Sequence, residues 1–244
     1  MIKIEHIYTG NWEAAIRSMR NPLDSWSKSD SGFGCFNENR RCMECHYKPD
    51  YCGISNDHYI LGPNDLKLAK TLANAGTDHR KFMRSIIFSC DITAPMYWWK
   101  EMDTYKVGSV RNSCSTMHTI TKKEFTLDDF SHEHLFKDNA LIVHIPNDFR
   151  VLNNTQWMMC VIDLLNGMRE AYLEEDDAEK KKEFWWQIIQ LLPSSYNQKA
   201  TWTANYEVLR NIYRARINHK LDEWHDFCYM IEDLPYSELI TGGE

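Results

Sequence analysis

Long apolar runs are missing from this sequence. No hydrophobic stretch approaches the roughly 20 residues that a helix needs to cross a bilayer. The first residues, MIKIEH, also lack the succession of basic, apolar and small residues that is typical of a secretion signal. We therefore expect a cytoplasmic location and no membrane partner.

Basic charge is scarce as well. The chain has 28 Lys and Arg against 35 Asp and Glu, which gives a formal net charge of −7. Proteins that hold nucleic acid need an excess of positive charge to neutralise phosphates. The charge balance therefore disfavours a nucleic-acid partner.

Internal repeats and low-complexity tracts are absent too, so the composition is that of a folded globular protein. Of the 244 residues 43% are hydrophobic and 26% are charged, which is enough to build a full core. We expect a single domain over residues 1–244 with a cysteine-rich insert at residues 30–56.

Hydrophobic periodicity predicts most of the regular elements. We expect strands at 2–8 and 85–92, helices at 12–20, 63–76 and 95–102, a helical hairpin at 156–192 and one long helix at 205–231. Residues 21–62 have no sustained period. A loop of this length is uncommon in a compact domain unless something pins it.

Four cysteines in the irregular segment form the pattern Cys35-x6-Cys42-x2-Cys45-x6-Cys52. Four thiolates at such spacing suit tetrahedral zinc, so we predict a structural, zinc-ribbon-like site with all four as ligands. An iron–sulfur cluster, ordinary free thiols, or His46 in place of one cysteine are the alternatives. A site closed by four ligands leaves no position for water and would not catalyse.

The other four cysteines stand alone in the sequence: Cys90, Cys114, Cys160 and Cys228. Isolated cysteines are usually core or neutral surface residues. We therefore expect none of them to be a nucleophile.

Two long segments resemble a known family. Residues 88–118, FSCDITAPMYWWKEMDTYKVGSVRNSCSTMH, are similar to the strand, Ala-Pro helix and signature loop of the flavin-dependent thymidylate synthases. Residues 192–224, LPSSYNQKATWTANYEVLRNIYRARINHKLDEW, are similar to the family's Leu-Pro turn, Trp-Thr-x-Asn junction and Arg-bearing helix. The chain is thus identified as a divergent member with an α/β (α+β) subunit.

The resemblance implies a homotetramer in which FAD and the substrate dUMP, or a related pyrimidine nucleotide, bind at subunit interfaces. The family transfers a one-carbon unit from methylenetetrahydrofolate to the uracil ring, and NADPH supplies the reducing equivalents through the flavin. We therefore expect hydrogen-bond donors for the diphosphate of FAD and for the phosphate of the nucleotide, and a cation near the pyrimidine.

The resemblance also assigns residues. The family signature R-H-R-x-x-S-x-N-E-x-S-x-R-Y has its counterpart from Thr104 to His118, and the upstream histidine of the family is matched by His79. Catalytic roles fall on Arg216 and Ser109. Cofactor contacts fall on His79, Lys81, Thr104, Tyr105, Lys106, Asn205 and Asn211, and substrate contacts on Glu101, Ser109, Asn112, Ser115 and Arg216.

The sequence departs from the family pattern at two further positions. Glu207 stands near a family arginine, and Ile189 stands where a phosphate-binding arginine is expected. Candidate replacement cations are Arg40, Arg41, Lys81, Arg84 and Arg111. The alternative function is a nucleotide-binding or scaffold protein that has lost catalysis, and the alternative for Arg216 is a salt bridge with Asp222 or Glu223.

Overall fold

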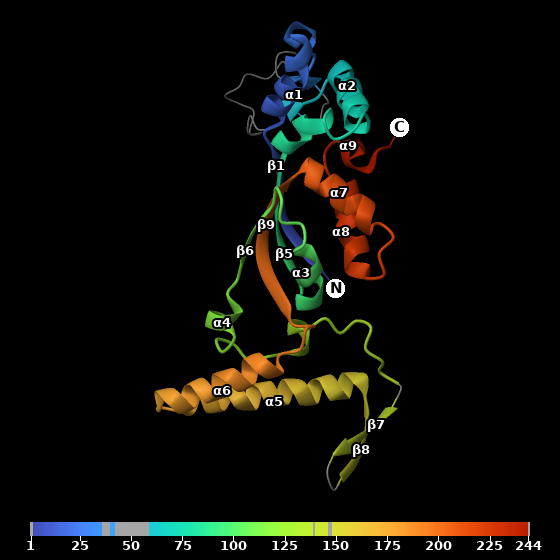
Figure 1. Ribbon diagram of the computed structural model, residues 1–244. Helices are drawn as coiled ribbons and strands as arrows, with labels where there is room; N and C mark the ends of the chain where they lie inside the picture. The colour runs from blue at the N-terminus through green and yellow to red at the C-terminus, as the bar shows by residue number, and fades with distance from the viewer. Residues whose placement is uncertain (1, 36–39, 42–58, 139, 146–147, 244) are drawn as a thin grey trace. The chain divides into compact units, whose positions relative to one another are not determined.

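The computed structural model describes residues 2–35, 40–41, 59–138, 140–145 and 148–243 (Figure 1). Its strands are β1 Lys3–Gly10, β2 Gly32–Cys35, β3 Arg40–Arg41, β4 Tyr59–Ile60, β5 Ile87–Pro95, β6 Val110–Ser113, β7 Ala140–Ile145, β8 Asp148–Asn153 and β9 Asn197–Asn205. Its α-helices are α1 Trp12–Arg20, α2 Pro63–Asn74, α3 Met96–Met102, α4 Thr116–Thr119, α5 Asn154–Glu174, α6 Ala178–Leu191, α7 Tyr206–Arg216, α8 Asp222–Glu232 and α9 Glu238–Thr241. No helix within the described ranges is long and apolar enough to cross a membrane.

Two compact units are each assembled from separated segments. Unit 1 contains residues 1–3, 92–104 and 112–201, and unit 2 contains residues 4–91, 105–111 and 202–244. A four-stranded sheet has the order β1-β5-β9-β6, and its strands β5 and β9 contribute residues to both units. This mixture of helices and strands confirms the predicted α/β class.

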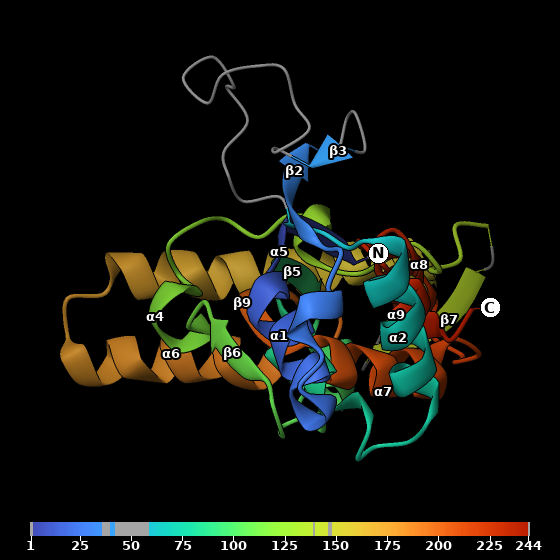
Figure 2. The same cartoon turned by 90° about the horizontal axis from the view of Figure 1, so that it is seen from above.

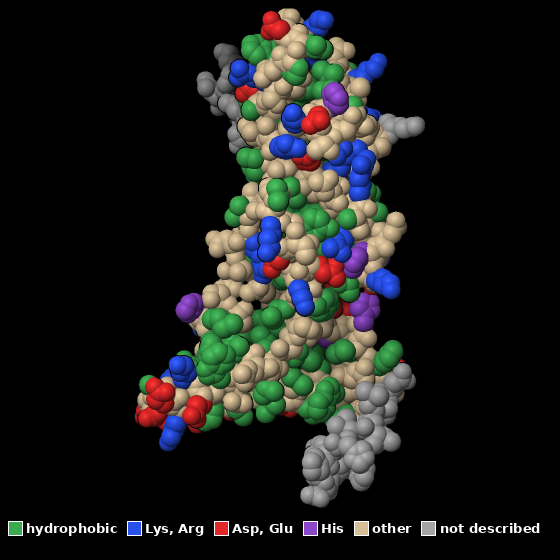
Figure 3. Space-filling model, in the orientation of Figure 1, with side chains coloured by type: hydrophobic (Ala, Val, Ile, Leu, Met, Phe, Trp, Pro, Cys, Tyr) green, Lys and Arg blue, Asp and Glu red, His purple; other side chains and the backbone are tan. Residues whose placement is uncertain are grey.

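Unit 1 carries the predicted helical hairpin, in which α5 and α6 lie side by side (Figure 1, Figure 2). Asn153 begins α5 with a capping box to Gln156, and the Asp177 side chain caps α6. The two helices bury Ile162, Leu165 and Ile188 in one core cluster with Phe125 and Phe130. Hydrophobic side chains also gather on the outer surface of this hairpin (Figure 3), where Trp157, Leu164 and Trp186 are exposed.

Unit 2 has a core of large aromatic side chains. The Trp202 ring meets Phe88 and Phe227 edge to face, with centroid distances of 6.1 Å and 6.0 Å. Trp202 and Phe88 lie on strands, and Phe227 lies on α8. Such contacts add to the apolar burial that holds helices against a sheet.

The predicted long helix at 205–231 is wrong, because the structure has two helices there, α7 and α8. The chain leaves the helix after Arg216, and the His219 ring nitrogen Nδ1 accepts a hydrogen bond from the Leu221 amide at 3.2 Å. Asp222 and Glu223 then begin α8, where acidic groups favour a helix N-terminus. Apolar residues continue with helical spacing across the break, which is why periodicity alone did not reveal it.

The segment around the cysteines contains short strands in its described part. Strand β2 pairs antiparallel with both β3 and β4. Cys35 ends β2, whereas Cys42, Cys45 and Cys52 lie outside the described residues, so the metal site stays a prediction. Elsewhere in the described ranges no group of three or more His, Cys, Asp or Glu is placed to hold a metal.

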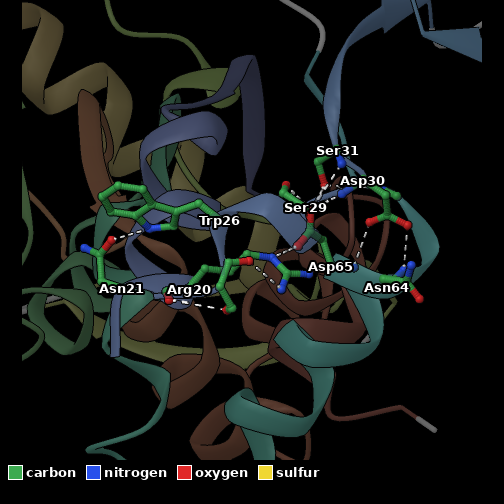
Figure 4. A network of polar contacts seen from close by, with 10 residues as sticks. Arg20, Asn21, Trp26, Ser29, Asp30, Ser31, Asn64 and Asp65 are labelled. Carbon is green, nitrogen blue, oxygen red and sulfur yellow. Dashed lines mark hydrogen bonds and ion pairs between the residues drawn. The ribbon is translucent and has the colours of Figure 1, made fainter. Parts of the chain in front are cut away.

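A buried carboxylate joins the two ends of this segment (Figure 4). Asp65 on α2 is fully buried and accepts hydrogen bonds from the hydroxyls of Ser29 and Ser31, each at 2.6 Å, and from Arg20. The amides of Asp30 and Ser31 donate to the same carboxylate. The carboxylate therefore fixes the chain on both sides of the cysteine-rich segment.

Candidate functional site

A cavity of about 430 Å³ lies within unit 1. The residues that line it come from β5, from the segment that follows β6, and from the start of β9 with the residue before it. They are Thr93, Cys114, Thr116, Thr119, Ile120, Lys122, Lys123, Phe125, Asp128, Asp129, Tyr196, Asn197, Gln198 and Lys199. The lining thus combines aromatic rings, amides, hydroxyls, three lysines and two aspartates, and one of these lysines, Lys123, pairs with Asp129.

Backbone pairing holds the polar wall of this cavity together. The Cys114 amide donates to the Lys199 carbonyl at 2.8 Å. The Gln198 amide nitrogen Nε2 donates to the Cys114 carbonyl at 3.2 Å and to Thr116 Oγ1 at 3.0 Å. The wall is therefore a defined surface that joins β9 to the chain after β6.

The aromatic side of the cavity is formed by Tyr196 and Phe125, whose rings meet edge to face at a centroid distance of 6.2 Å. Burial raises the pKa of the Tyr196 phenol, and the negative charge of Asp129 adds to the rise. The phenol therefore stays protonated at neutral pH.

One acceptor in the cavity wall has no partner. Asn197 Oδ1 is buried, and no described residue donates a hydrogen bond to it, while its amide nitrogen donates to the Asp128 carbonyl at 3.3 Å. A buried polar atom without a partner costs free energy. An N–H group of a bound molecule would remove that cost.

The predicted substrate residues of unit 1 are Glu101, Asn112 and Ser115, and none of them lines this cavity. Cys114 and Thr116 line it, whereas their neighbour Ser115 precedes α4, and its carbonyl accepts from the amides of His118 and Thr119. Asn112 is exposed on β6, and the Glu101 carbonyl accepts hydrogen bonds from the Thr104 amide and hydroxyl.

Unit 2 brings together three of the predicted residues. Arg216, at the end of α7, donates from Nε to the Tyr105 hydroxyl at 2.9 Å. Its guanidinium carbon lies 4.6 Å from the centroid of the Trp224 ring and 5.5 Å from that of Tyr105. Ser109 donates its hydroxyl to the Tyr105 carbonyl. The two rings therefore fix the plane of the Arg216 cation.

The start of α7 is a second assembly point in unit 2. Asn205 caps the helix by accepting from the Val208 amide at 3.1 Å. Gly108 has φ +79°, and a Cβ there would lie 3.1 Å from Asn205 Nδ2. A side chain at position 108 would therefore be strained and would push the signature loop away from Asn205.

Glu207 in the first turn of α7 holds two arginines. Its buried carboxylate pairs with Arg84 and, at 3.3 Å, with Nε of Arg80. Arg80 also donates from Nη2 to the Thr77 hydroxyl at 3.0 Å. Arg84, one of the proposed replacement cations, is thus fixed by Glu207, and this pairing raises its pKa.

The remaining predicted cofactor residues, His79, Lys81, Lys106 and Asn211, are all exposed on unit 2. Lys81 lies 4.0 Å from the Asp78 carboxylate.

Sequence reasoning missed the residues that build the cavity wall, above all Gln198 and Lys199. Strand β9 alternates, with Ala200 and Trp202 buried and Lys199 and Thr201 exposed. That alternation was the available signal, because it separates a core face from a face that can meet a ligand. Ile189, where an arginine was expected, packs against the core of unit 1 instead.

No protein-family model matches this sequence. No curated protein matches it significantly either. Solved structures do match over nearly the whole chain. A crystal structure of thymidylate synthase X (ThyX) from Helicobacter pylori with FAD and dUMP has a TM-score of 0.61 and 14% identity, covering 99% of this chain and 98% of that one.

A second structure of the flavin-dependent thymidylate synthase ThyX from Helicobacter pylori, complexed with FAD and dUMP, has a TM-score of 0.62 and 14% identity. It covers 98% of each chain. The predicted resemblance is therefore confirmed at the level of the fold: this chain has the fold of the flavin-dependent thymidylate synthases.

Proposed function

We propose that this protein is a divergent flavin-dependent thymidylate synthase-like enzyme, which transfers a one-carbon unit from methylenetetrahydrofolate to dUMP or a related pyrimidine nucleotide. The observation that carries the proposal is the unit 1 cavity, which offers the donors, acceptors and rings that such a nucleotide needs. The similar Helicobacter pylori proteins are described with dUMP and FAD.

The cavity's chemistry suits each part of the nucleotide. Asn197 and Gln198 supply amide groups for the polar edge of the base, and the unpartnered Asn197 Oδ1 suits the N–H of uracil. The rings of Phe125 and Tyr196 give an apolar wall for the base. Lys199 and Lys122 supply positive charge for the phosphate.

Lys199→Ala is expected to weaken dUMP binding by about 10- to 150-fold, because a hydrogen bond to a charged group contributes roughly 1.5–3 kcal/mol. Isothermal titration calorimetry measures the change. Lys182→Ala, which removes an exposed lysine from α6 outside the cavity, is the matched control and should bind like wild type. Equal affinity in both variants would contradict the assignment of the phosphate position.

Unit 2 residues fit the flavin. Arg80 and Arg84 offer guanidinium groups that Glu207 holds in place, and Lys81 adds a third cation on the same segment. His79, Asn205 and Asn211 are the other proposed contacts in this unit, together with Tyr105 and Lys106 of the signature loop. When bound, FAD would pass reducing equivalents from NADPH to the transferred carbon.

Purified protein mixed with FAD is expected to keep a flavin absorption spectrum after desalting. Riboflavin lacks the diphosphate that the arginines would hold, so it should be lost under the same conditions. If FAD is also lost on desalting, the redox part of the proposal is contradicted, whereas the proposed nucleotide binding is not affected.

A nucleotide-binding or scaffold protein without redox chemistry is the second candidate function. The observation that favours it is the pairing of Arg80 and Arg84 with Glu207, because an internal carboxylate competes with a phosphate for both cations. We propose a homotetramer in either case, and light scattering measures it.

A further inference from the structure

We infer that Arg210 and Arg214 of α7 form a binding site for a phosphate group beside Gly242, at the end of α9. The inference goes beyond the proposed function, since neither arginine is among the residues proposed to bind dUMP or FAD. All three residues lie in unit 2, where α7 packs against α9 (Figure 1).

Arg210 brings a charge into the core of unit 2 that no carboxylate balances. Two arginines are buried within the described part of the chain, Arg20 and Arg210. Arg20 pairs with the Asp65 carboxylate. Arg210 is fully buried, and none of the described carboxylates pairs with it. Buried charges in proteins are normally paired, because an uncompensated charge away from water is costly.

The groups that do bind Arg210 are neutral. Its Nη1 donates to the carbonyls of Leu239 and Ile240 in α9, and its Nη2 donates to Asn74 Oδ1 at 2.7 Å. Its Nε is buried and has no hydrogen-bond partner among the described residues. The two carbonyls make Arg210 a cap for the end of α9, but carbonyl and amide oxygens carry only partial charge. The positive charge of Arg210 is therefore only partly offset.

Arg214 brings a second guanidinium group to the same place. A Cβ atom added to Gly242 would lie 3.6 Å from Arg210 Nη2 and 3.8 Å from Arg214 Nη2. Asn74 Oδ1 lies 3.7 Å from the same point. Gly242 has φ +81°, which glycine adopts without strain, so no side chain fills the point on which these three groups converge.

The two cations disfavour each other. Burial, together with the positive charges of Arg214 and Arg80, lowers the pKa of Arg210 from 12.5 to about 10, so Arg210 is still charged at neutral pH. Glu207, the carboxylate in the first turn of the same helix, is already paired with Arg80 and Arg84. Arg214 is exposed and forms no ion pair within the described residues. An anion beside both guanidinium groups would relieve this repulsion.

Phosphate is the anion that this set of donors fits best. Guanidinium groups donate in a plane and match the oxygens of phosphate in pairs. Two guanidinium groups also balance the two charges of a phosphate, whereas a carboxylate has only one. Because Arg214 is exposed, a phosphate can reach it from solvent. The phosphate can be a free ion or the end group of a nucleotide, and separate probes distinguish these sources.

Isothermal titration calorimetry with orthophosphate and, separately, with AMP tests the site at constant ionic strength. Wild-type protein should bind at least one of these probes with a Kd below about 1 mM. Arg214→Gln should weaken that binding by at least about 10-fold, because hydrogen bonds to a charged group are lost. Arg17→Gln is the matched control: it removes an exposed arginine from α1, also in unit 2, and should bind like wild type.

Two results would overturn the inference: no binding of either probe by the wild type, or equal affinity in the wild type and Arg214→Gln. Binding of AMP that is tighter than that of orthophosphate assigns the phosphate to a nucleotide, and the reverse order assigns it to the free ion. A protein that binds phosphate here but neither dUMP nor FAD would contradict the proposed function and leave this site intact.

An independent measurement is modification of arginines by phenylglyoxal followed by mass spectrometry. Arg214 and Arg17 are both exposed, so both should react in the protein without phosphate. The bound probe should protect Arg214 and leave Arg17 reactive. Equal rates at Arg214 with and without the probe would contradict the inference.

Discussion

Asp65→Asn is expected to lower the free energy of unfolding by about 3–5 kcal/mol, the cost of breaking a buried ion pair from one side. Arg20 is almost as buried as Asp65 and would keep its charge with only a neutral amide opposite. The two serine hydroxyls and two backbone amides would also lose a charged acceptor. The melting temperature should fall by roughly 6–20 °C.

Asp24→Asn is the matched control, because Asp24 is exposed and its left-handed backbone, with φ 45°, is one that asparagine tolerates. It should melt within about 2 °C of wild type. If Asp65→Asn melts at the same temperature as the control, the carboxylate does not hold the two ends of the cysteine-rich segment.

The Asp65 contribution should depend on pH. Burial alone would raise its pKa, but hydrogen bonds from Ser29, Ser31 and Arg20 and the Arg20 charge together hold the pKa below the usual value. A lowered pKa means that the stabilisation is complete above an ordinary carboxyl pKa of about 3.9 and is lost as pH falls below it. Wild type and Asp65→Asn should therefore differ by a constant amount above pH 5 and converge in acid.

Local patterns were enough to predict the elements whose boundaries have local causes. The α5–α6 hairpin was predicted from its helical pattern and the terminating Pro193, and the structure adds the cap at Asp177. The β7–β8 hairpin was not predicted, and neither was the break after Arg216. The break depends on a side chain, His219, that accepts a backbone hydrogen bond within an apolar pattern that continues through it.

Prediction of the candidate site from the sequence has a different limit. The resemblance located the signature loop and α7, and from these came Tyr105, Ser109 and Arg216, which the structure brings together in unit 2. The cavity wall pairs Cys114 with Lys199, 85 positions later in the numbering, and Arg84 meets Glu207 across a separation of 123. Such pairings come from sheet and helix packing, and a single sequence carries no local signal for them.

Arg216→Ala is expected to lower dUMP-dependent NADPH oxidation by about 100- to 1,000-fold, the usual effect of removing one donor that stabilises charge in a transition state. Trp224 and Tyr105 hold the guanidinium plane, so the group is oriented before substrate binds. Arg216→Lys should lose almost as much of this activity. An ammonium group keeps the charge, but it neither stacks on the ring nor donates hydrogen bonds in a plane.

The loss should appear mainly in kcat, because a cation that stabilises charge in the transition state acts most strongly once that charge develops. Arg214→Ala is the control: it removes an exposed arginine from the same last turn of α7 and should leave kcat unchanged. An Arg216→Ala enzyme with wild-type kcat would contradict the proposed catalytic role of Arg216. Its ring contacts with Tyr105 and Trp224 would then serve only to hold the end of α7 against the signature loop and α8.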